Sequence, residues 1–284
     1  MNALAVIAGT VRRIGSHLGG AVGLVIVAVV VLSAVFAPLV ATHDPDALDV
    51  LNRFSGPTAQ HWLGTDHLGR DLYSRLVHGA SVAMAVALTA ISTALIAGTL
   101  LGILAASLPT RSERLILILF DVVSSFPSLV LALAAVAVFG PSTMLVVIIV
   151  AVTLVPHFGR VARAQVLTVR NAPYIEAERL LGASSWRIVF SHILPNIAGP
   201  LVVLASIDIP VVITIEAGLS FIGLGVRPPL ASWGTLIYDG YAYLSDSKLP
   251  VVIASSALGL ATLGFTLFGE ALRDAVDPRL DGER

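Results

Sequence analysis

The stretch that decides the fold is residues 174–195, YIEAERLLGASSWRIVFSHILP, a polar segment in a chain made almost wholly of apolar runs. Asn171 is a candidate helix cap just ahead of it, and Pro173 suits the first turn of a helix. Glu176 lies near the positive N-terminal end of that helix, and Gly182 supplies a left-handed residue that stops it. The sequence therefore predicts a short helix that ends at the glycine.

A second short helix is predicted after the glycine. Ser184 or Ser185 can cap it, and its apolar residues are spaced so that one face lies against a membrane bundle until Pro195 opens the next span. Two short helices joined by a glycine turn form a compact surface for a soluble partner. An ordinary membrane-anchoring loop is the alternative that the spacing alone leaves open.

The composition is that of an integral membrane protein. Hydrophobic residues make up 56% of the chain, charged residues make up 12%, and the mean hydropathy is +0.91. This leaves too little polar surface to cover a water-soluble globule of 284 residues. The chain has no cysteine, which excludes disulfides and cysteine-ligated metals.

Six apolar runs are long enough to cross a bilayer, which takes about 20 residues of helix. They are residues 18–41, 79–107, 115–139, 142–158, 195–218 and 250–269. The first run is longer than a signal-peptide core of about 7 to 15 residues, so a retained helix is favoured over a cleaved signal. The predicted fold class is an all-α integral membrane protein with six transmembrane helices.

The basic residues predict the orientation of these helices. With the N-terminus inside, the internal segments hold twelve of the 17 arginine and lysine residues, which is the bias expected of the cytoplasmic side. Both termini are then cytoplasmic. The expected organisation is a cytoplasmic N-terminal segment at 1–17, a first transmembrane helix at 18–41, an extracytoplasmic segment at 42–78, a five-helix core at 79–272 that includes a cytoplasmic loop at 159–195, and a cytoplasmic tail at 273–284.

The 174–195 stretch resembles the EAA loop of permease subunits of ABC importers, in its peptide-importer form. The resemblance to the dipeptide and oligopeptide permease family of the DppC and OppC type continues in order along nearly the whole chain. The matching segments are FAPL at 36–39, DP at 44–45, HWLGTD at 61–66, LGRD at 68–71, SRL at 74–76, SFP at 125–127, EAE at 176–178 with Gly182 and HILP at 192–195, EAGLSFIGLG at 216–225, PP at 228–229, SWG at 232–234 and LRDAVDPRL at 272–280. Two residues depart from the family pattern: Glu178 stands where alanine is usual, and Ser81 where arginine is frequent.

The resemblance implies a type I ABC importer permease fold, in which the EAA loop forms a coupling helix seated on a cytoplasmic ATPase. The residues expected to couple to the ATPase are Tyr174, Glu176, Ala177, Glu178, Gly182, Ala183, Trp186, His192, Leu194 and Pro195. The implied partners are a homologous second permease in a heterodimer, two cytoplasmic ATPase subunits, an extracytoplasmic solute-binding protein and membrane lipid, with no nucleic acid. The implied location is the bacterial plasma (inner) membrane.

The chain lacks the residues of an ATPase. A P-loop needs a lysine that reaches the nucleotide phosphates, and the sole lysine, Lys248, lies in an outward segment without glycine-rich spacing. A serine nucleophile elbow and a His-Glu-x-x-His zinc pair are also absent. We therefore expect no enzyme activity and no cofactor in this chain, with ATP and Mg bound by partner ATPase subunits.

Ionisable residues within the spans are candidates for the translocation path, because a carboxylate near the bilayer centre costs about 2.5 to 3.5 kcal/mol. Asp208 lies in mid-helix beside Pro210, where it can attract the amino group of a passing peptide or bond to a neighbouring span. Glu216, near the outer end of its helix, can bond backbone N–H groups of the following turn or line an outer gate.

Ser124, Ser125 and Pro127 are further candidates for the translocation path. Pro127 removes a helical hydrogen bond at mid-membrane, and the serine hydroxyls can satisfy the freed carbonyls, as suits a helix that bends. Asp121, one turn earlier, is expected to pair with Arg111 or Arg114.

The outer segment 42–78 is predicted to cap the bundle and to meet the solute-binding protein. Leu63 and Leu68 can pack it onto the bundle together with Trp62, which with Asp66, Arg70 and Asp71 is also a candidate contact with that partner. Histidines and carboxylates are dense in this segment, and a transition-metal site is the alternative. Without fixed spacing such residues more often belong to a solvated loop, so no metal site is predicted.

The predicted function is therefore the permease half of a translocation pathway for short peptides in an ATP-driven importer. The same machine carrying nickel complexes, glutathione or another small solute is the alternative. A proton-coupled secondary transporter is less favoured, because the sequence shows no convincing internal repeat.

Overall fold

The computed structural model describes residue 9 and residues 11–276, and within them every regular element is a helix apart from one isolated bridge between Thr65 and Asp71. The expected N-terminal segment 1–17 and tail 273–284 lie largely outside these residues. The helices are α2 (Leu18–Val35), α3 (Ala37–Val40), η1 (Val50–Asn52), α4 (Leu72–Ser107), α5 (Thr110–Ser124), α6 (Ser128–Phe139), α7 (Thr143–Arg170), α8 (Pro173–Leu180), α9 (Ser185–Ile188), η2 (Val189–Ile193), α10 (Leu194–Phe221), α11 (Trp233–Ala242) and α12 (Leu249–Val276).

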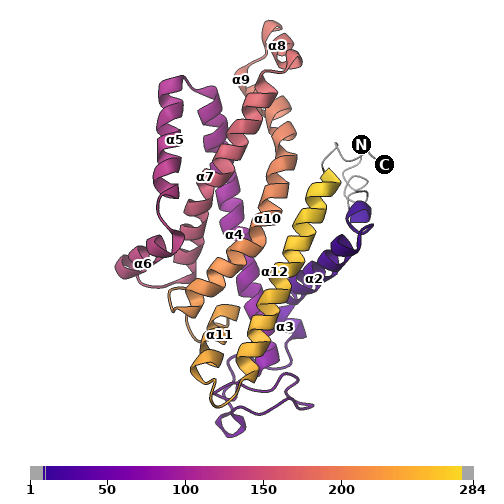
Figure 1. The fold of residues 1–284 in the computed structure, drawn as a ribbon, viewed down its shortest axis with the longest axis vertical. Coiled ribbons are helices and arrows are strands. Elements are labelled where there is room, and N and C mark those ends of the chain that lie inside the picture. Colours follow the sequence, from indigo (N-terminus) through magenta and orange to yellow (C-terminus); the bar gives the residue numbers. More distant parts are fainter. Residues whose placement is uncertain (1–8, 10, 277–284) are drawn as a thin grey trace.

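Long helices run roughly side by side along the molecule, with α8 and α9 projecting at one end and the α3–α4 connection and α11 at the other (Figure 1). Five helices are long and apolar enough to cross a membrane, and the bent pair α5 and α6 makes a sixth span if the pair is counted as one. The all-α membrane fold predicted from the sequence is confirmed.

Helices α4 and α7 pack against each other at the centre of the bundle, and glycines let their backbones approach closely. A Cβ atom placed on Gly98 would lie 2.7 Å from both the Cβ of Phe158 and the carbonyl oxygen of Val155. Gly102 is equally crowded at the same interface, where a Cβ atom would lie 2.5 Å from the carbonyl oxygen of Gly159. Small residues let helix backbones approach where lipid supplies no hydrophobic driving force, so packing must hold the pair together.

Two helices extend beyond the apolar runs that predicted them. Helix α4 begins at Leu72 rather than at residue 79, because the Asp71 side chain accepts a hydrogen bond from the backbone N–H of Ser74 and caps it there. Helix α7 does not end near residue 158 but continues through Pro156 to Arg170. The proline removes one hydrogen bond, and the close packing beside it keeps the helix continuous.

The third predicted span is not a single helix. It is divided into α5 and α6, which meet at an angle of 82° across residues 125–127. Pro127 cannot donate to the preceding turn, and the Ser125 hydroxyl donates to the carbonyl oxygen of Asp121 at 2.7 Å. The helix that was predicted to bend at Pro127 is therefore interrupted there, and the Ser125 hydroxyl supplies a hydrogen bond to the Asp121 carbonyl oxygen just before the interruption.

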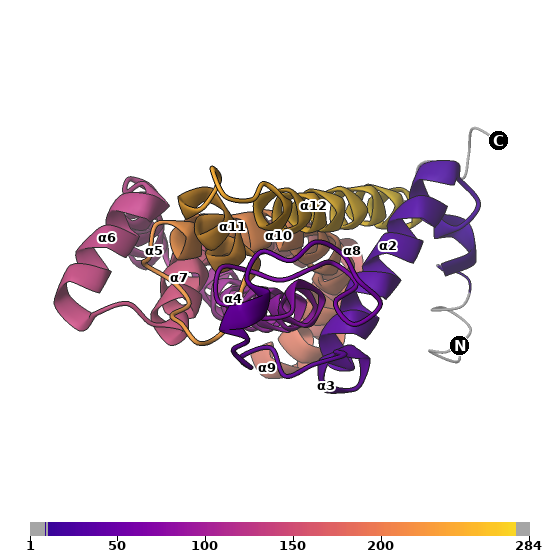
Figure 2. The same cartoon turned by 90° about the horizontal axis from the view of Figure 1, so that it is seen from below.

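The end of the bundle opposite α8 and α9 contains a short helix, α11, that the sequence analysis did not predict. Ser232 caps it in a reciprocal capping box with Thr235, a Ser-x-x-Thr variant of the usual pattern. Seen from below, the connection between α3 and α4 crosses beneath α4 while α11 lies alongside (Figure 2). The indole N–H of Trp233 donates to the Leu76 carbonyl oxygen at 3.0 Å and fastens α11 to α4.

Candidate functional site

Residues 173–193 form a knob that projects beyond the ends of α7 and α10 (Figure 1). Pro173 occupies the first turn of α8 as predicted, but the capping residue is Ala172, and Asn171 instead ends α7. Gly182 has φ +84°, which confirms the left-handed stop. Ser184 caps α9 by accepting from the backbone N–H of Arg187.

The knob packs by one face and exposes the other. Ile175, Ile188 and Ile193 are buried against the bundle. Leu180 and Leu181, at the end of α8, are each 85% exposed, and Trp186 of α9 is 73% exposed. Large apolar side chains gathered on a polar projection mark an interaction surface, because water disfavours them and a partner would cover them.

An ion pair and ring contacts join the two halves of the knob. His192 Nε2 lies 3.5 Å from Glu178 Oε1, so the glutamate that departs from the family pattern has a partner within the chain. The rings of Tyr174 and His192 have centroids 6.1 Å apart, so two contacts through His192 link α8 to η2. Within the second half, Trp186 stacks on Phe190 at 5.7 Å.

The expected coupling residues fall into two groups by exposure. Tyr174, Glu176, Ala177, Gly182, Trp186 and Pro195 are exposed, whereas Glu178, Ala183, His192 and Leu194 are half-buried. Pro195 does not open a new span after a break, because residues 185–221 form one continuous helical run with a π-helical turn at Val189–Ile193. A displacement of the knob is therefore transmitted directly to α10.

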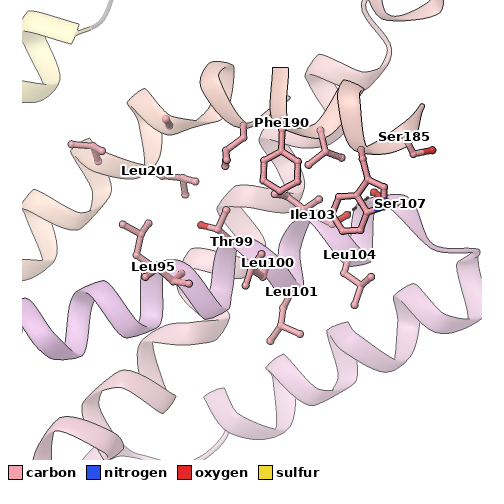
Figure 3. Close-up of a pocket in the computed structure, with 16 residues that line it drawn as sticks. Leu95, Thr99, Leu100, Leu101, Ile103, Leu104, Ser107, Ser185, Phe190 and Leu201 are labelled. Atoms are coloured by element: carbon pink, nitrogen blue, oxygen red, sulfur yellow. Dashed lines mark hydrogen bonds between the residues drawn. The ribbon is translucent and has the colours of Figure 1, made fainter. Parts of the chain in front are cut away.

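An apolar groove of about 680 Å³ lies beside the knob, and the sequence analysis did not predict it. Leu95, Leu100 and Leu104 of α4 lie on one side of it, and Phe190 and Leu201 lie on the other (Figure 3). Trp186 and Ser185 complete its end at the knob. The exposed leucines and isoleucines repeated every fourth residue along α4 are the sequence signal that marks this face.

Asp208 is buried at mid-helix in α10, with its residue 8% exposed. His157 of α7 lies with Nε2 3.7 Å from Asp208 Oδ2, and that oxygen has no hydrogen-bond partner among the described residues. The half-exposed His157 side chain was not singled out from the sequence. The structure thus places the carboxylate near a neighbouring span without the expected hydrogen bond to it, and its role in the translocation path stays a prediction.

Glu216 is fully buried in α10, and its partner differs from the expected backbone N–H groups. The Ser220 hydroxyl donates to Glu216 Oε1 at 2.7 Å, and the Ser220 oxygen accepts from the backbone N–H of Val226 at 3.0 Å. Glu216 therefore holds the turn that follows α10 through a serine relay.

The break between α5 and α6 exposes Ser124, Ser125 and Pro127. The expected pairing of Asp121 with Arg111 or Arg114 is wrong. Arg160 of α7 donates to Asp121 Oδ1 at 2.8 Å, because α7 continues past residue 158 and carries this arginine alongside α5.

In the segment 42–78, the burial of side chains is the reverse of the prediction: the charged residues are buried and the tryptophan is exposed. Asp66, Arg70 and Asp71 are 2%, 5% and 2% exposed, so they do not face a partner. Arg70 Nε donates to Asp66 Oδ2 at 2.7 Å, and a second nitrogen lies 3.4 Å from Asp239 of α11. Trp62, expected to pack inward as well as to meet a partner, is 55% exposed.

The reason for this reversal is the crossing of the 42–71 connection over the end of α4. Buried charges must be paired, and the tertiary fold brings the arginine and two carboxylates together from segments far apart in the chain. Burial raises the pKa of Asp239, although His67 and Arg70 act to lower it.

Comparison with known proteins identifies the family. The family model described as binding-protein-dependent transport system inner membrane component matches residues 98–282, and the N-terminal TM domain of oligopeptide transport permease C matches residues 6–57. The chain is similar in fold to the permease-containing MetNI methionine ABC transporter in an inward-facing conformation, with a TM-score of 0.59 at 18% identity, covering 72% of this chain and 96% of that chain.

Curated relatives match over almost the full length. The probable D,D-dipeptide transport system permease protein DdpC of Escherichia coli (strain K12) is 39% identical, covering 92% of this chain and 87% of the relative. The di/tripeptide transport system permease protein DppC of Pseudomonas aeruginosa (strain UCBPP-PA14) is 40% identical, covering 93% and 90%. The glutathione transport system permease protein GsiD of Pectobacterium atrosepticum is 35% identical, covering 95% and 89%. This chain belongs to the binding-protein-dependent transport system inner membrane component family, as a multi-pass membrane permease subunit of an ABC transporter.

Proposed function

We propose that this chain forms half of a translocation pathway for short peptides, in an importer driven by separate ATPase subunits. The observation that carries the proposal is the knob, a projection that exposes Leu180, Leu181 and Trp186 and whose second half continues into α10. A partner that grips α8 would move α10 with it, because the Glu178–His192 contact ties α8 to the helical run of residues 185–221. Closure of two ATPase subunits around ATP and Mg would supply that movement.

Short peptides are the proposed cargo because the relatives named for dipeptide and oligopeptide transport match most of the chain. A small solute such as glutathione is the second candidate, supported by the 35% identical permease named for glutathione transport. Asp208 with His157 supplies a polar pair within the spans that a peptide amino group would meet if the pair lines the path.

The remaining parts of the machine are proposals as well. The chain pairs with a homologous permease, and the outer end, with Trp62 exposed, receives an extracytoplasmic solute-binding protein. The knob end faces the cytoplasm, in keeping with the excess of basic residues on that side. ATP hydrolysis belongs to the partner subunits and not to this chain.

Matched substitutions at the two ends of the molecule test the proposal. Leu181→Asp places a charge at the exposed tip, while Leu51→Asp places the same charge at a side chain that is 98% exposed at the other end. We expect Leu181→Asp to reduce both co-purification of the ATPase subunits and ATP-driven peptide uptake at least about tenfold, a loss of roughly 1.4 kcal/mol in docking. Leu51→Asp should leave ATPase attachment unchanged.

The energy source separates this proposal from a secondary transporter. Uptake into proteoliposomes should stop without the ATPase subunits and should be indifferent to a protonophore. Uptake that persists without ATPase subunits and collapses with the proton gradient would contradict the proposal, as would normal ATPase attachment and uptake in Leu181→Asp.

A further inference from the structure

His43, His61 and Asp71 bring three metal-ligating atoms together beside the N-terminus of α4. These atoms all lie within 4.8 Å of one another. His61 Nδ1 lies 2.9 Å from Asp71 Oδ1, and His43 Nδ1 lies 3.9 Å from the same oxygen. The three residues come from the connection after α3, the loop before α4 and the capping position of α4 itself.

We propose that His43, His61 and Asp71 form a binding site for one divalent transition-metal ion of the zinc type. Two imidazole nitrogens and one carboxylate oxygen are ligands that Zn²⁺ takes readily, and three protein ligands leave a fourth position open to water. Because these atoms already lie within 4.8 Å of one another, side-chain rotations, including release of His43 Nδ1 from the Thr42 hydroxyl 3.0 Å away, would complete the coordination without a backbone rearrangement.

Asp71 is oriented as a metal ligand would be. Its Oδ2 accepts from the backbone N–H of Ser74 at 2.8 Å and from the Thr42 hydroxyl at 3.3 Å, which leaves Oδ1 directed at the histidines. Such outer contacts fix the ligand and tune its basicity.

The two histidine rings are stacked, with centroids 4.7 Å apart, and both Nδ1 atoms lie toward Asp71. His61 Nδ1 carries a proton when it donates to Asp71, and on metal binding that proton shifts to Nε2 so that the Nδ1 lone pair binds the ion. A cavity of about 340 Å³ lined by Thr42, His43 and His78 opens beside the site and gives an ion access.

A second cluster of the same residue types does not support a cation site. Asp66, His67 and Asp239 also approach one another within 4.8 Å. Two guanidinium groups already neutralise that cluster, because Arg70 Nε lies 2.7 Å and Arg75 Nε lies 3.6 Å from Asp66 Oδ2. Within the described residues no arginine is ion-paired with the His43–His61–Asp71 cluster, so the two clusters provide an internal comparison.

The test uses the full chain purified in detergent micelles and stripped with a chelator. Zn²⁺ is titrated against a chromogenic chelator, and the melting temperature is measured with and without Zn²⁺. We expect one Zn²⁺ per chain and a rise in melting temperature on binding. His43→Ala and His61→Ala should each lower the affinity for Zn²⁺ at least about tenfold. Mutation of groups that only hydrogen-bond to metal ligands already costs about that much, and these variants remove a ligand itself.

His67→Ala is the matched control, because this histidine lies in the same region of the chain and neither belongs to the three-residue site nor lines the cavity beside it. The control should keep wild-type affinity. Should His61→Ala fail to fold because its bond to Asp71 is lost, His43→Ala decides the matter, since His43 has the more exposed side chain, at 38%. Absence of stoichiometric binding, full affinity in His43→Ala, or loss of binding in His67→Ala would each overturn the proposal.

Discussion

Gly182 is the residue of the knob whose backbone is left-handed, at φ +84°. A Cβ atom added there would meet no atom within 4 Å, so crowding inside this chain does not require the glycine. The requirement is conformational, because a side chain in this region of φ and ψ costs about 1–2 kcal/mol. A substitution at Gly182 therefore tests whether the turn needs its left-handed backbone conformation.

Gly182→Ala is expected to destabilise the knob locally by about 1 kcal/mol, without changing membrane insertion. Gly182→Asn, a residue that tolerates the left-handed region better, should cost less. Backbone amide hydrogen exchange over residues 173–193 measures the effect. Equal exchange rates in the alanine variant and the wild type would show that the turn is not under this constraint.

The Asp71 carboxylate both caps α4 and bonds to His61 in the preceding loop. Its pKa therefore leads us to expect that the stability of the fold depends on pH. Burial would raise its pKa, but the hydrogen bonds from Ser74 and His61 prevail and lower it below the ordinary value of 3.8. A carboxyl group with a depressed pKa in the folded state stabilises the fold fully above its unfolded pKa. That contribution is lost as the pH falls through the lower, folded pKa.

Asp71→Asn keeps an N-capping side chain but removes the ionisable group, and we expect it to lower the free energy of unfolding by about 1 kcal/mol at neutral pH. The difference in melting temperature from the wild type should stay constant down to the ordinary value of 3.8 and shrink below it. Measurements in detergent with a chelator present exclude metal effects. A difference that grows on acidification would contradict the sign of this shift.

At the scale of elements, α4 and α7 show how glycine position rather than glycine content controls packing. Gly98 of α4 lies so close to α7 that a Cβ atom would fall 2.7 Å from the Val155 carbonyl oxygen. Gly259 of α12 has nothing within 4 Å of the same imaginary atom. The two positions are both inside long apolar helices, so they form a matched pair.

Gly98→Ala is expected to destabilise the bundle by about 1–3 kcal/mol, because the helices must separate to admit the methyl group. Gly259→Ala should be neutral or stabilising by up to about 1 kcal/mol, because alanine is the better helix former. Thermal unfolding of both variants in the same detergent checks the pair. Equal melting temperatures would indicate that the α4–α7 contact is looser than described.

At the scale of the whole molecule, the knob and the 42–71 connection lie at opposite ends of the bundle (Figure 1). The distribution of basic residues predicts that the knob end faces the cytoplasm. Because the chain has no cysteine, single cysteines can report the orientation without background. Trp62 and Trp186 are suitable positions, since they are 55% and 73% exposed at the two ends.

We expect Trp62→Cys to react with a membrane-impermeant thiol reagent in intact spheroplasts. Trp186→Cys should react only after the membrane is permeabilised, because the reagent cannot cross the bilayer. Labelling of both cysteines in denaturant controls for reactivity. The reverse pattern would place the knob outside and remove the basis of ATPase coupling.

The sequence by itself determined the membrane class, the helical fold, the family and the knob with its left-handed Gly182. These follow from composition, from apolar run length and from local backbone preferences, which act over a few neighbouring residues. Local signals also located Pro127 as an irregular point and Ser184 as a candidate cap.

Only the tertiary structure decided which polar groups are buried and with what partners. Asp66 and Arg70 look like loop residues in sequence, yet the crossing of the 42–71 connection encloses them. His157 meets Asp208, and Arg160 meets Asp121, because α7 continues past Pro156, a proline that local rules take as a helix end. Pairing between distant segments depends on helix packing, and a one-dimensional pattern holds no measure of the distance between its residues once the chain has folded.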